Sequence, residues 1–389
     1  MAITIQKPSL NEIEGMKTPF YYYDMNLLRH TLKVVTDEAN KYGFIVHYAI
    51  KANNEPPILE EVNKFGLGID CVSGEEVRCA VEAGFSPNHI VYAGVGKSDD
   101  EINYALDNKI FSFNVESREE LEVINELAAK KGVKARIALR INPDVDPKTH
   151  QYISTGLKDN KFGISYGEID EVLVKLETLN NIEIIGIHFH IGSQITKLEV
   201  FEQLCDRVNT IASWFSDKNI KLDHINVGGG LGINYENPES EPVADFERYF
   251  KIFGDGIKLA EGQTLHFELG RSIVAQCGML VSRVLYNKVT GSKKNYVIID
   301  GSMTELIRPA LYKAHHAIEN ISKTDVTETE VYSVAGGVCE SSDVFTNEIT
   351  LPVTSRGDVI VLKSAGAYGS SMASRYNLRA LPESLFSDI

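Results

Sequence analysis

The sequence predicts an α/β protein: a (β/α)8 TIM-like barrel with a C-terminal antiparallel β domain. The first observation is that short runs rich in Val, Ile and Phe alternate with longer amphipathic segments between residues 44 and 268. Parallel strands buried on both faces and joined by helices produce this alternation. The second observation is that strand-like runs after Gly278 follow one another without long helices between them, as in antiparallel sheets.

Eight runs in the first region are candidate barrel strands. In chain order they are residues 44–50, 67–71, 89–93, 111–115, 135–141, 184–190, 224–227 and 265–269. The segments between them have helical character. In 117–131, for example, Ser117 stands at the N-cap position and apolar residues recur at helical spacing. An open doubly wound sheet also alternates strands and helices, so it is the alternative fold.

The candidate strands of the second region are residues 279–289, 295–299, 330–335, 344–353 and 358–362. Between the fifth and sixth candidate barrel strands, residues 142–161 form a long, turn-rich segment. Loops of that length in compact domains are often functional. We therefore expect this segment to contribute to the activity.

The composition excludes several classes of protein. The chain has 389 residues, and 39 Lys and Arg against 54 Asp and Glu give a net charge of −15, which disfavours nucleic-acid binding. No apolar stretch approaches the roughly 18–20 residues of a membrane span, and the N-terminus lacks the features of a signal peptide. Five scattered cysteines without a CxxC pair indicate reduced thiols. We therefore expect a cytoplasmic protein.

Candidate site residues follow the carboxyl ends of the predicted barrel strands, the end that carries active sites in this architecture. Lys51 follows the first strand and Asp70 ends the second, while residues 188–193 (HFHIGS) end the sixth. Glycines 228–230 end the seventh strand, and residues 268–271 (ELGR) end the eighth. Each feature alone has an ordinary structural explanation, such as a turn or a helix cap. Their placement at one end of the barrel indicates a common site.

These residue types suit a flat cofactor that carries a phosphate and an aldehyde. A lysine that is partly desolvated at such a strand end can attack an aldehyde through its amine, and Lys51 stands at this place. Backbone amides of the glycines, with Ser193, Gly270 and Arg271, suit a phosphate. Glu268 has apolar neighbours in the sequence and would hold a pyridine nitrogen protonated, which makes the ring a stronger electron sink.

The pair His188 and His190 has three interpretations. Residues two apart on a strand face the same side, so the pair matches the HxH of a barrel metallohydrolase. Such a site needs further ligands, and His224 and His266 stand at the starts of their strands instead. The second interpretation is a structural role. The third, which we favour, is that one imidazole stacks on a flat cofactor.

The motifs together resemble the fold type III, alanine-racemase-like pyridoxal-phosphate decarboxylases. The C-terminal half is similar to the diaminopimelate decarboxylase branch of that family, and the resemblance extends from about residue 18 to 380. The family commonly has proline where this chain has Leu269. The motifs that carry the resemblance are residues 48–53 (YAIKAN), 152–157 (YISTGL), 190–194 (HIGSQ), 228–230, 268–271, 306–312 (LIRPALY), 339–343 (CESSD) and 366–369 (GAYG).

The resemblance implies a role for each site residue. Lys51 would hold pyridoxal 5'-phosphate covalently, His190 would stack on its ring, and Glu268 would pair with its nitrogen. Cys339, from the partner subunit, would return a proton to the substrate. The phosphate would be bound by, or lie beside, Ser193, Gly229, Gly230, Gly270, Arg271 and Tyr368; the substrate would be bound by Arg271, Arg308, Tyr312, Glu340 and Tyr368.

The resemblance also implies the organisation of the chain. Residues 24–270 would form the cofactor-binding barrel, and residues 1–23 and 271–389 would form the β domain that contributes to substrate binding and to the dimer interface. A homodimer would share its active sites between subunits. We expect a small amino-acid substrate and no metal, nucleic acid or membrane partner.

Charge matching favours meso-2,6-diaminopimelate, which would give L-lysine and CO2, as the substrate. Its distal end carries an ammonium, which Glu340 can pair with, and a carboxylate, which Arg308 can bind with two parallel hydrogen bonds. Ornithine- and carboxynorspermidine-type substrates lack the distal carboxylate, so a polyamine-precursor decarboxylase is the alternative function. A non-catalytic decarboxylase-like regulator and a metallohydrolase are the alternatives from other classes.

Overall fold

The computed structural model describes residues 3–145 and 161–388, and the chain divides into two compact units. The barrel unit comprises Leu32–Gly232 and Asp245–Gly270. The β unit comprises Met1–Thr31, Ile233–Ala244 and Arg271–Ile389. Compared with the bounds expected from the sequence, residues 24–31 and 233–244 belong to the β unit. The expected functional segment 142–161, and with it the motif 152–157, lies mostly outside the described residues.

The barrel unit contains a closed barrel of parallel strands, which confirms the predicted fold class. Each strand pairs in parallel with its neighbours, and β10 pairs with β2 to close the barrel. The short strand β7 (Ile164–Ser165) adds to the edge of β6. The barrel strands are β2 (Ile45–Ala49), β3 (Gly68–Cys71), β4 (Ile90–Tyr92), β5 (Ser112–Val115), β6 (Ala135–Asn142), β8 (Ile182–His188), β9 (His224–Asn226) and β10 (Thr264–Leu269).

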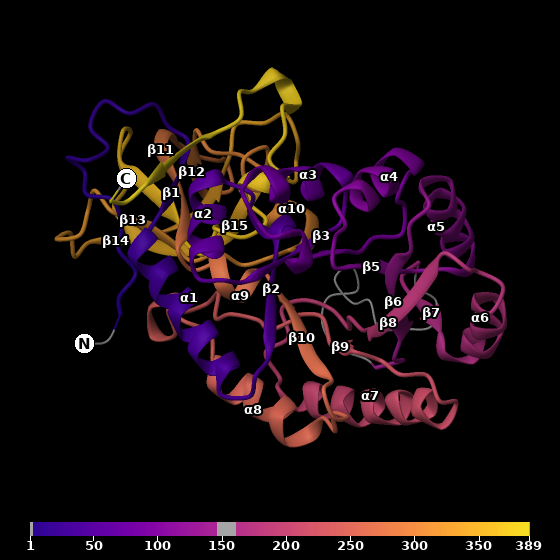
Figure 1. The fold of residues 1–389 in the computed structure, drawn as a ribbon. Coiled ribbons are helices and arrows are strands. Elements are labelled where there is room, and N and C mark those ends of the chain that lie inside the picture. Colours follow the sequence, from indigo (N-terminus) through magenta and orange to yellow (C-terminus); the bar gives the residue numbers. More distant parts are fainter. Residues whose placement is uncertain (1–2, 146–160, 389) are drawn as a thin grey trace. The chain divides into compact units, whose positions relative to one another are not determined.

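Helices surround these strands (Figure 1). Three begin at serine N-caps: the side chains of Ser73, Ser98 and Ser117 each accept the backbone N–H of the residue three positions later. Such caps satisfy amide groups that have no partner within the helix. The helices are α1 (Met25–Asn40), α2 (Pro56–Lys64), α3 (Gly74–Glu82), α4 (Asp99–Asp107), α5 (Arg118–Lys131), α6 (Ile169–Leu176), α7 (Glu199–Asp217) and α8 (Phe246–Gly256).

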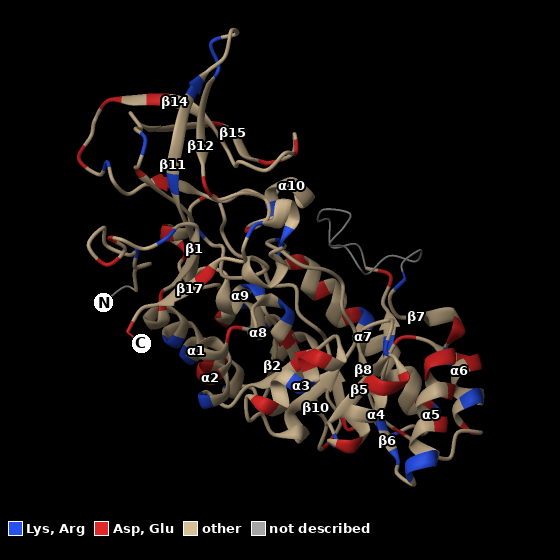
Figure 2. Cartoon of the chain, turned by 90° about the horizontal axis from the view of Figure 1, so that it is seen from above, with Lys and Arg blue, Asp and Glu red and all other residues tan. Residues whose placement is uncertain are grey.

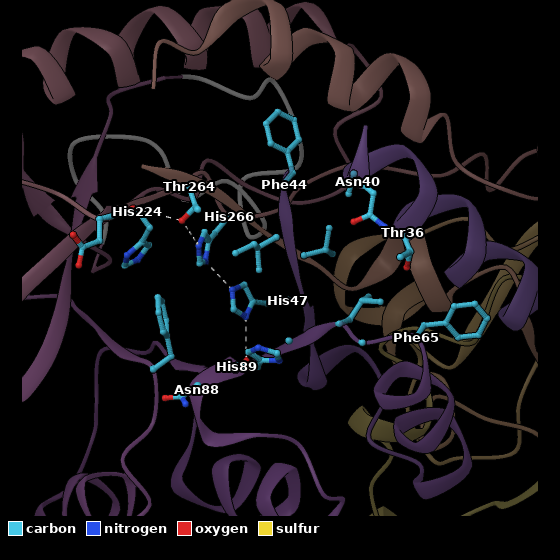
Figure 3. A pocket seen from close by; sticks show the side chains of 18 of the residues that line it. Thr36, Asn40, Phe44, His47, Phe65, Asn88, His89, His224, Thr264 and His266 are labelled. Carbon is cyan, nitrogen blue, oxygen red and sulfur yellow. Dashed lines mark hydrogen bonds between the residues drawn. The ribbon is translucent and has the colours of Figure 1, made fainter. Parts of the chain in front are cut away.

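At the amino ends of the barrel strands, histidine side chains line a cavity of about 590 Å³ (Figure 3). His47 Nδ1 is 3.2 Å from the His89 carbonyl, which can only accept, so this nitrogen carries the hydrogen. His47 Nε2 therefore accepts from His266 Nδ1 at 2.9 Å, and His266 Nε2 accepts from Thr264 Oγ1 at 2.9 Å. In all three hydrogen bonds the imidazole that takes part is neutral.

Burial keeps this histidine group uncharged. It lowers the pKa of His47 to about 4 and that of His224 to about 3, and His266 also has a strongly lowered pKa. Two glycines make room for the rings: a Cβ at Gly68 would lie 2.3 Å from His47 Nδ1, and a Cβ at Gly186 would lie 2.3 Å from His224 Cε1. We call His47, His224 and His266 the lower histidine layer.

The β unit is built mainly from antiparallel strands. The order is β13-β16-β11-β12-β14-β15, and β1 pairs with both β11 and β17. Two pairs, β12–β14 and β1–β17, are parallel, so the predicted antiparallel sheet is mixed at these places. The strands are β1 (Phe20–Tyr23), β11 (Gly278–Val289), β12 (Asn295–Ile299), β13 (Ile318–Asn320), β14 (Thr329–Ala335), β15 (Val344–Pro352), β16 (Val359–Leu362) and β17 (Glu383–Phe386).

Strand β11 joins the two parts of this sheet. Its first half pairs with β1 and β16, and its second half pairs with β12 after an irregularity between Val284 and Tyr286. Phe20 and Tyr22 of β1 pack with Met279 and Val281 of β11 in a buried apolar cluster. Two short helices, α9 (Arg271–Val274) and α10 (Arg308–Tyr312), complete the unit.

The surface of the barrel unit carries both charge signs. On α5 and α6, acidic and basic residues lie near one another (Figure 2). The two helices are linked by Lys175–Glu122 and Arg118–Glu171 ion pairs. Exposed pairs of this kind contribute little stability individually. No helix in residues 3–145 and 161–388 is long and apolar enough to cross a membrane.

Candidate active site

Lys51 and Asp70 form an ion pair at the carboxyl ends of β2 and β3. Lys51 lies in the turn Ile50–Ala52 directly after β2, and its Nζ is 2.7 Å from Asp70 Oδ2. Asp70 is fully buried, whereas 35% of the Lys51 side chain is exposed. Burial and the negative charge of Glu268 raise the pKa of Asp70 to about 7, although Lys51 opposes the shift. The lysine amine thus reaches the open end of the barrel beside a carboxyl group that titrates near neutral pH.

Glu268, near the end of β10, is a buried carboxylate that accepts three hydrogen bonds. Asn114 Nδ2 and Asn226 Nδ2 donate to Oε1 at 3.0 and 2.8 Å. His188 Nε2 donates to Oε2 at 3.0 Å. Burial disfavours the charged form, but the interactions with His188 outweigh it and hold the pKa of Glu268 far below its usual range. The carboxylate is therefore ionised and fixed in one orientation.

His190 lies beyond the end of β8, which stops at His188. The expectation that both rings face one side of a strand therefore does not apply. The Gly229 N–H donates to His190 Nδ1 at 3.3 Å, which leaves the ring hydrogen on Nε2 when the imidazole is neutral. Burial, with the nearby cations Arg140 and Lys51, lowers the pKa of His190 to about 3. The ring is therefore neutral at pH 7.

The glycines 228–230 form a turn that has no room for side chains. Gly228 and Gly230 have φ angles of +68° and +114°, which favour glycine. A Cβ at Gly229 would lie 1.9 Å from the Glu268 carbonyl oxygen, and one at Gly230 would lie 2.8 Å from the Gly192 oxygen. The turn 228–230 therefore consists of backbone without side chains. A Cβ at Gly270 would similarly lie 2.9 Å from Ala52 Cβ.

In the β unit, two buried arginines share one tyrosine ring. Arg271 donates from Nη1 to the Tyr235 hydroxyl at 2.7 Å. The Arg308 guanidinium carbon lies 4.6 Å from the centre of the same ring, and that of Arg271 lies 4.8 Å from the Tyr368 ring. The aromatic faces stabilise the two cations electrostatically. This cluster can bind anionic groups of a ligand.

His316 orients Arg308. Its Nδ1 donates to the Lys363 carbonyl at 2.8 Å, so its Nε2 carries the lone pair that accepts from Arg308 Nη1 at 2.8 Å. Burial and the neighbouring guanidinium lower the pKa of His316 to about 3. Arg308 Nε, by contrast, is buried without a hydrogen-bond partner among the described residues. The guanidinium is held at one edge and has a donor left for another group.

The remaining predicted residues of the β unit differ in exposure. Tyr312 ends α10 and is partly buried. Tyr368 adopts a left-handed backbone conformation, with φ +56°, which is uncommon for an aromatic residue. Cys339 is exposed, as is Glu340, which accepts a hydrogen bond from the Tyr376 hydroxyl at 2.7 Å.

Comparisons with known proteins place this geometry in a family. Residues 28–275 match the model of the pyridoxal binding domain of pyridoxal-dependent decarboxylases. A diaminopimelate decarboxylase from Bacteroides thetaiotaomicron is 52% identical over 380 residues, which are 97% of this chain and 98% of the relative. The chain belongs to the diaminopimelate decarboxylase family.

Solved structures agree with this assignment. A diaminopimelate decarboxylase from Helicobacter pylori, complexed with L-lysine, is 40% identical and has a TM-score of 0.91 over 97% of this chain and 93% of that one. A lysine/ornithine decarboxylase from Vibrio vulnificus, complexed with putrescine, has a TM-score of 0.82 at 20% identity, and this likeness concerns the fold alone. The match with the first of these structures covers both units of the chain.

The family's cofactor is pyridoxal phosphate, and the barrel residues fit it. Lys51 supplies an amine at the carboxyl ends of the barrel strands, and the glycine turn lies at the same end, where a phosphate could meet backbone without side chains. The ionised Glu268 is the partner that a protonated pyridine nitrogen requires. Asp70 Oδ1 is buried without a partner among the described residues. No trio of His, Cys, Asp or Glu side chains in residues 3–145 and 161–388 is arranged to hold a metal ion.

Sequence reasoning missed several residues of this family site. It did not single out Asn114, Asn226 or His316, and it did not assign His188 to Glu268. One signal could have found Asn226, because it lies two residues after His224 on a strand and so faces the same side. Asn114 is the polar residue of an otherwise apolar strand end. His316 carries no comparable signal, because its partner Arg308 is on a different element.

Proposed function

We propose that the protein is a pyridoxal-phosphate-dependent carboxy-lyase that converts meso-2,6-diaminopimelate into L-lysine and CO2, the last step of lysine biosynthesis. The observation that carries this proposal is the buried Glu268 carboxylate, which three donors hold ionised at the same end of the barrel as the Lys51 amine. That pair suits a cofactor with an aldehyde and a pyridine nitrogen. The 52% identical relative named diaminopimelate decarboxylase supports the choice of substrate.

Each barrel residue has a task in holding the cofactor. Lys51 would bind it covalently through Nζ, His190 would lie against its ring, and Glu268 would accept the hydrogen of its ring nitrogen. When bound, pyridoxal phosphate supplies an electron sink for the pair released by decarboxylation. The phosphate would be bound by, or lie beside, Ser193, Gly229, Gly230 and Gly270, with Arg271 and Tyr368 of the β unit.

The reaction needs one bond cleavage and one proton return. The bond between the α-carbon and its carboxylate breaks, CO2 leaves, and its electron pair remains on the α-carbon side. The Cys339 thiol then donates a proton to that carbon, and solvent restores the thiol. A thiol carries one hydrogen, which it can donate to a carbanion that is held beside it.

Residues of the β unit would read the distal end of the substrate. We assign the distal carboxylate to Arg308, whose guanidinium forms no ion pair with a carboxylate of residues 3–145 and 161–388. Glu340 would pair with the distal ammonium. Arg271, Tyr312 and Tyr368 would complete the pocket. A substrate without the distal carboxylate would leave the Arg308 cation unpaired, which costs binding free energy.

The test is product analysis with three substrates offered side by side. Purified protein with pyridoxal phosphate is incubated with meso-diaminopimelate, ornithine or carboxynorspermidine, and amines and CO2 are quantified. We expect L-lysine and CO2 in equal amounts from the first substrate, and neither from the variant Lys51→Ala. Preferred turnover of ornithine or carboxynorspermidine would favour a polyamine-precursor decarboxylase. No turnover of any substrate would favour the non-catalytic regulator.

We further propose a cytoplasmic homodimer in which each subunit supplies Cys339 and Glu340 to its partner's site. Both side chains are exposed in the single chain, and all five cysteines are free, as in reducing compartments. Mixing the inactive variants Lys51→Ala and Cys339→Ala tests the sharing. If subunits exchange at random, about a quarter of the wild-type activity returns, because half of the dimers have one intact site. No recovery in verified mixed dimers would contradict it.

A further inference from the structure

Asn226 connects two parts of the barrel site that the proposed function assigns to opposite ends of the cofactor. Its Nδ2 donates to Glu268 Oε1 at 2.8 Å, and its Oδ1 accepts the Gly228 N–H at 2.9 Å. Glu268 is the proposed partner of the ring nitrogen, and Gly228 begins the turn proposed to receive the phosphate. Asn226 is fully buried, so water cannot replace either bond.

The orientation of the Asn226 amide is determined by its partners. The Gly228 N–H can only donate, so it must face the amide oxygen. The amide nitrogen then faces Glu268, which accepts because it is ionised. The backbone closes the ring, since the Glu268 N–H donates to the Gly228 carbonyl at 2.8 Å. Glu268 and Gly228 are thus joined twice, once by main chain and once through Asn226.

The next residue of the turn is held in a similar way. The Gly229 N–H donates to His190 Nδ1 at 3.3 Å. In the proposed function, His190 lies against the face of the cofactor's pyridine ring. The first two amides of the glycine turn are therefore directed at side chains of the site. Side chains of the site therefore fix the positions of Gly228 and Gly229 in the turn.

We propose that Asn226 is a positioning residue that sets the distance between the ring-nitrogen partner Glu268 and the phosphate turn at Gly228–Gly230. This inference rests on the proposed function. It requires asparagine in particular, because aspartate would place two carboxylates against each other at Glu268, and leucine would satisfy neither partner. An unmade hydrogen bond at a buried group is costly.

Asn114 is the matched control. It donates to the same oxygen of Glu268 at 3.0 Å, but its own Oδ1 has no hydrogen-bond partner among the described residues. Asn114→Ala therefore removes a donor from Glu268 and leaves the glycine turn untouched. Asn226→Ala removes a donor from Glu268 and also the acceptor for Gly228. Asn226→Asp keeps an acceptor for Gly228 and replaces the donor to Glu268 with a carboxylate oxygen.

The experiment measures binding to the two ends separately. Pyridoxal phosphate is removed from each variant, and the dissociation constants of pyridoxal phosphate and of inorganic phosphate are measured by fluorescence. We expect Asn226→Ala to weaken inorganic phosphate binding by about tenfold or more, the loss typical of an unsatisfied buried group. Asn114→Ala and Asn226→Asp should stay within about twofold of the wild type for inorganic phosphate, because both keep the Gly228 acceptor.

The effect of each variant on the cofactor's pyridine ring is measured by spectroscopy. The visible absorbance of the bound cofactor is titrated with pH, and all three variants should shift it, with Asn226→Asp shifting it most because a second carboxylate raises the pKa of Glu268. Melting temperatures identify losses that come from instability alone. If Asn226→Ala does not fold, Asn226→Ser, which also loses the reach to both partners, replaces it.

Equal phosphate affinities for Asn226→Ala and Asn114→Ala would overturn the proposal. The same holds if Asn226→Asp loses as much phosphate affinity as Asn226→Ala. These results differ from failure of the proposed function, in which the wild type itself would neither bind pyridoxal phosphate through Lys51 nor release lysine. A wild type that binds and reacts, with variants that do not differ, refutes only the role of Asn226.

Discussion

The barrel unit and the β unit each bury a charged side chain against one imidazole, and they use the imidazole in opposite ways. In the barrel, His188 donates a hydrogen from Nε2 to the Glu268 carboxylate. In the β unit, His316 accepts a hydrogen at Nε2 from the Arg308 guanidinium. The second ring nitrogen accounts for the difference. His316 Nδ1 donates to the Lys363 carbonyl, whereas His188 Nδ1 has no partner among the described residues.

The comparison shows how one residue type serves both signs of charge. A backbone carbonyl at Nδ1 forces the lone pair of the ring onto Nε2, where it suits a cation. Without that carbonyl, Nε2 can carry the hydrogen and suit an anion. The two charges are also balanced differently. Glu268 receives three donors, whereas Arg308 lies on a tyrosine ring and has one donor without a described partner. Glu268 therefore has acceptor capacity for one further donor, and Arg308 has one N–H group left for a ligand.

The largest expected effect comes from removing the buried carboxylate. Glu268→Gln should lower kcat for meso-diaminopimelate by about a thousandfold, the scale of losing a preorganised electrostatic group in an active site. Glutamine keeps the shape and the acceptor oxygen, so the loss would be due to charge. Steady-state kinetics with saturating pyridoxal phosphate measure it. Activity within tenfold of the wild type would mean that the ionised state of Glu268 is not needed.

Arg308 should show the next largest effect, and it should act on one substrate class. Arg308→Leu should lower kcat/KM for meso-diaminopimelate by about a hundredfold, because a bidentate charged contact is lost. Residual ornithine turnover should change little, since ornithine has no distal carboxylate. Both substrates are measured with the same preparation. Equal losses on both would show that Arg308 does not read the distal group.

The two imidazoles can be compared directly with matched variants. His316→Phe removes the acceptor for Arg308 and should raise KM about tenfold with little change in kcat. His188→Phe removes the donor to Glu268 and should lower kcat by a similar factor. Glutamine can supply either an acceptor or a donor without titrating, so His316→Gln and His188→Gln should recover most of the loss. If glutamine and phenylalanine are equivalent at either site, the hydrogen bond there has no role.

The smallest effect at neutral pH concerns the lower histidine layer, whose histidines lie at the amino ends of the strands. Burial lowers the pKa of His47 to about 4 and of His224 to about 3, whereas an unfolded histidine titrates near 6.5. Their contribution to stability is therefore complete above pH 6.5 and is lost as the pH falls towards 4. Asp70, with its pKa raised to about 7, acts in the opposite direction, because the folded state takes up its proton first.

A single substitution separates these opposing contributions. Neither ring nitrogen of His224 has a hydrogen-bond partner among the described residues, so His224→Gln removes a titrating group at little cost in bonds. We expect its melting temperature to fall less than that of the wild type between pH 7.5 and pH 5. Differential scanning fluorimetry at the two pH values gives the result. If the melting temperatures of His224→Gln and of the wild type fall by the same amount between the two pH values, His224 does not contribute to acid destabilisation.

The barrel could be predicted from the sequence more fully than the contacts of its site. All eight barrel strands begin and end within two residues of the predicted positions, because each is a short, mainly apolar run between turn residues. Strands β1, β13 and β17 were not predicted, since they are short and their pairing partners are far away in the sequence. Lys51, His190 and Glu268 could be singled out because each lies at or beyond a strand end.

The polar residues that support them could not be found in the same way. Asn114 and Asn226 act only because the closed barrel brings β5 and β9 to Glu268, and strand order around a barrel has no local sequence signal. His316 and Arg308 depend on the direction of two side chains and on a backbone carbonyl 47 residues away from His316. Hydrogen-bond direction of this kind follows from tertiary structure alone.

The pairing of β1 has a consequence for how the chain is made. Phe20 of β1 lies opposite Glu383 of β17. One edge of β1, the first strand to be synthesised, therefore has no pairing partner until almost the last residues of the chain are translated. Until then that edge of β1, which carries the aromatic run 20–23 (FYYY), is unpaired, and long delays between synthesis and pairing favour aggregation. A nascent chain that stalls within the barrel therefore carries an unsatisfied strand edge. Such a chain is a natural substrate for chaperones and proteases.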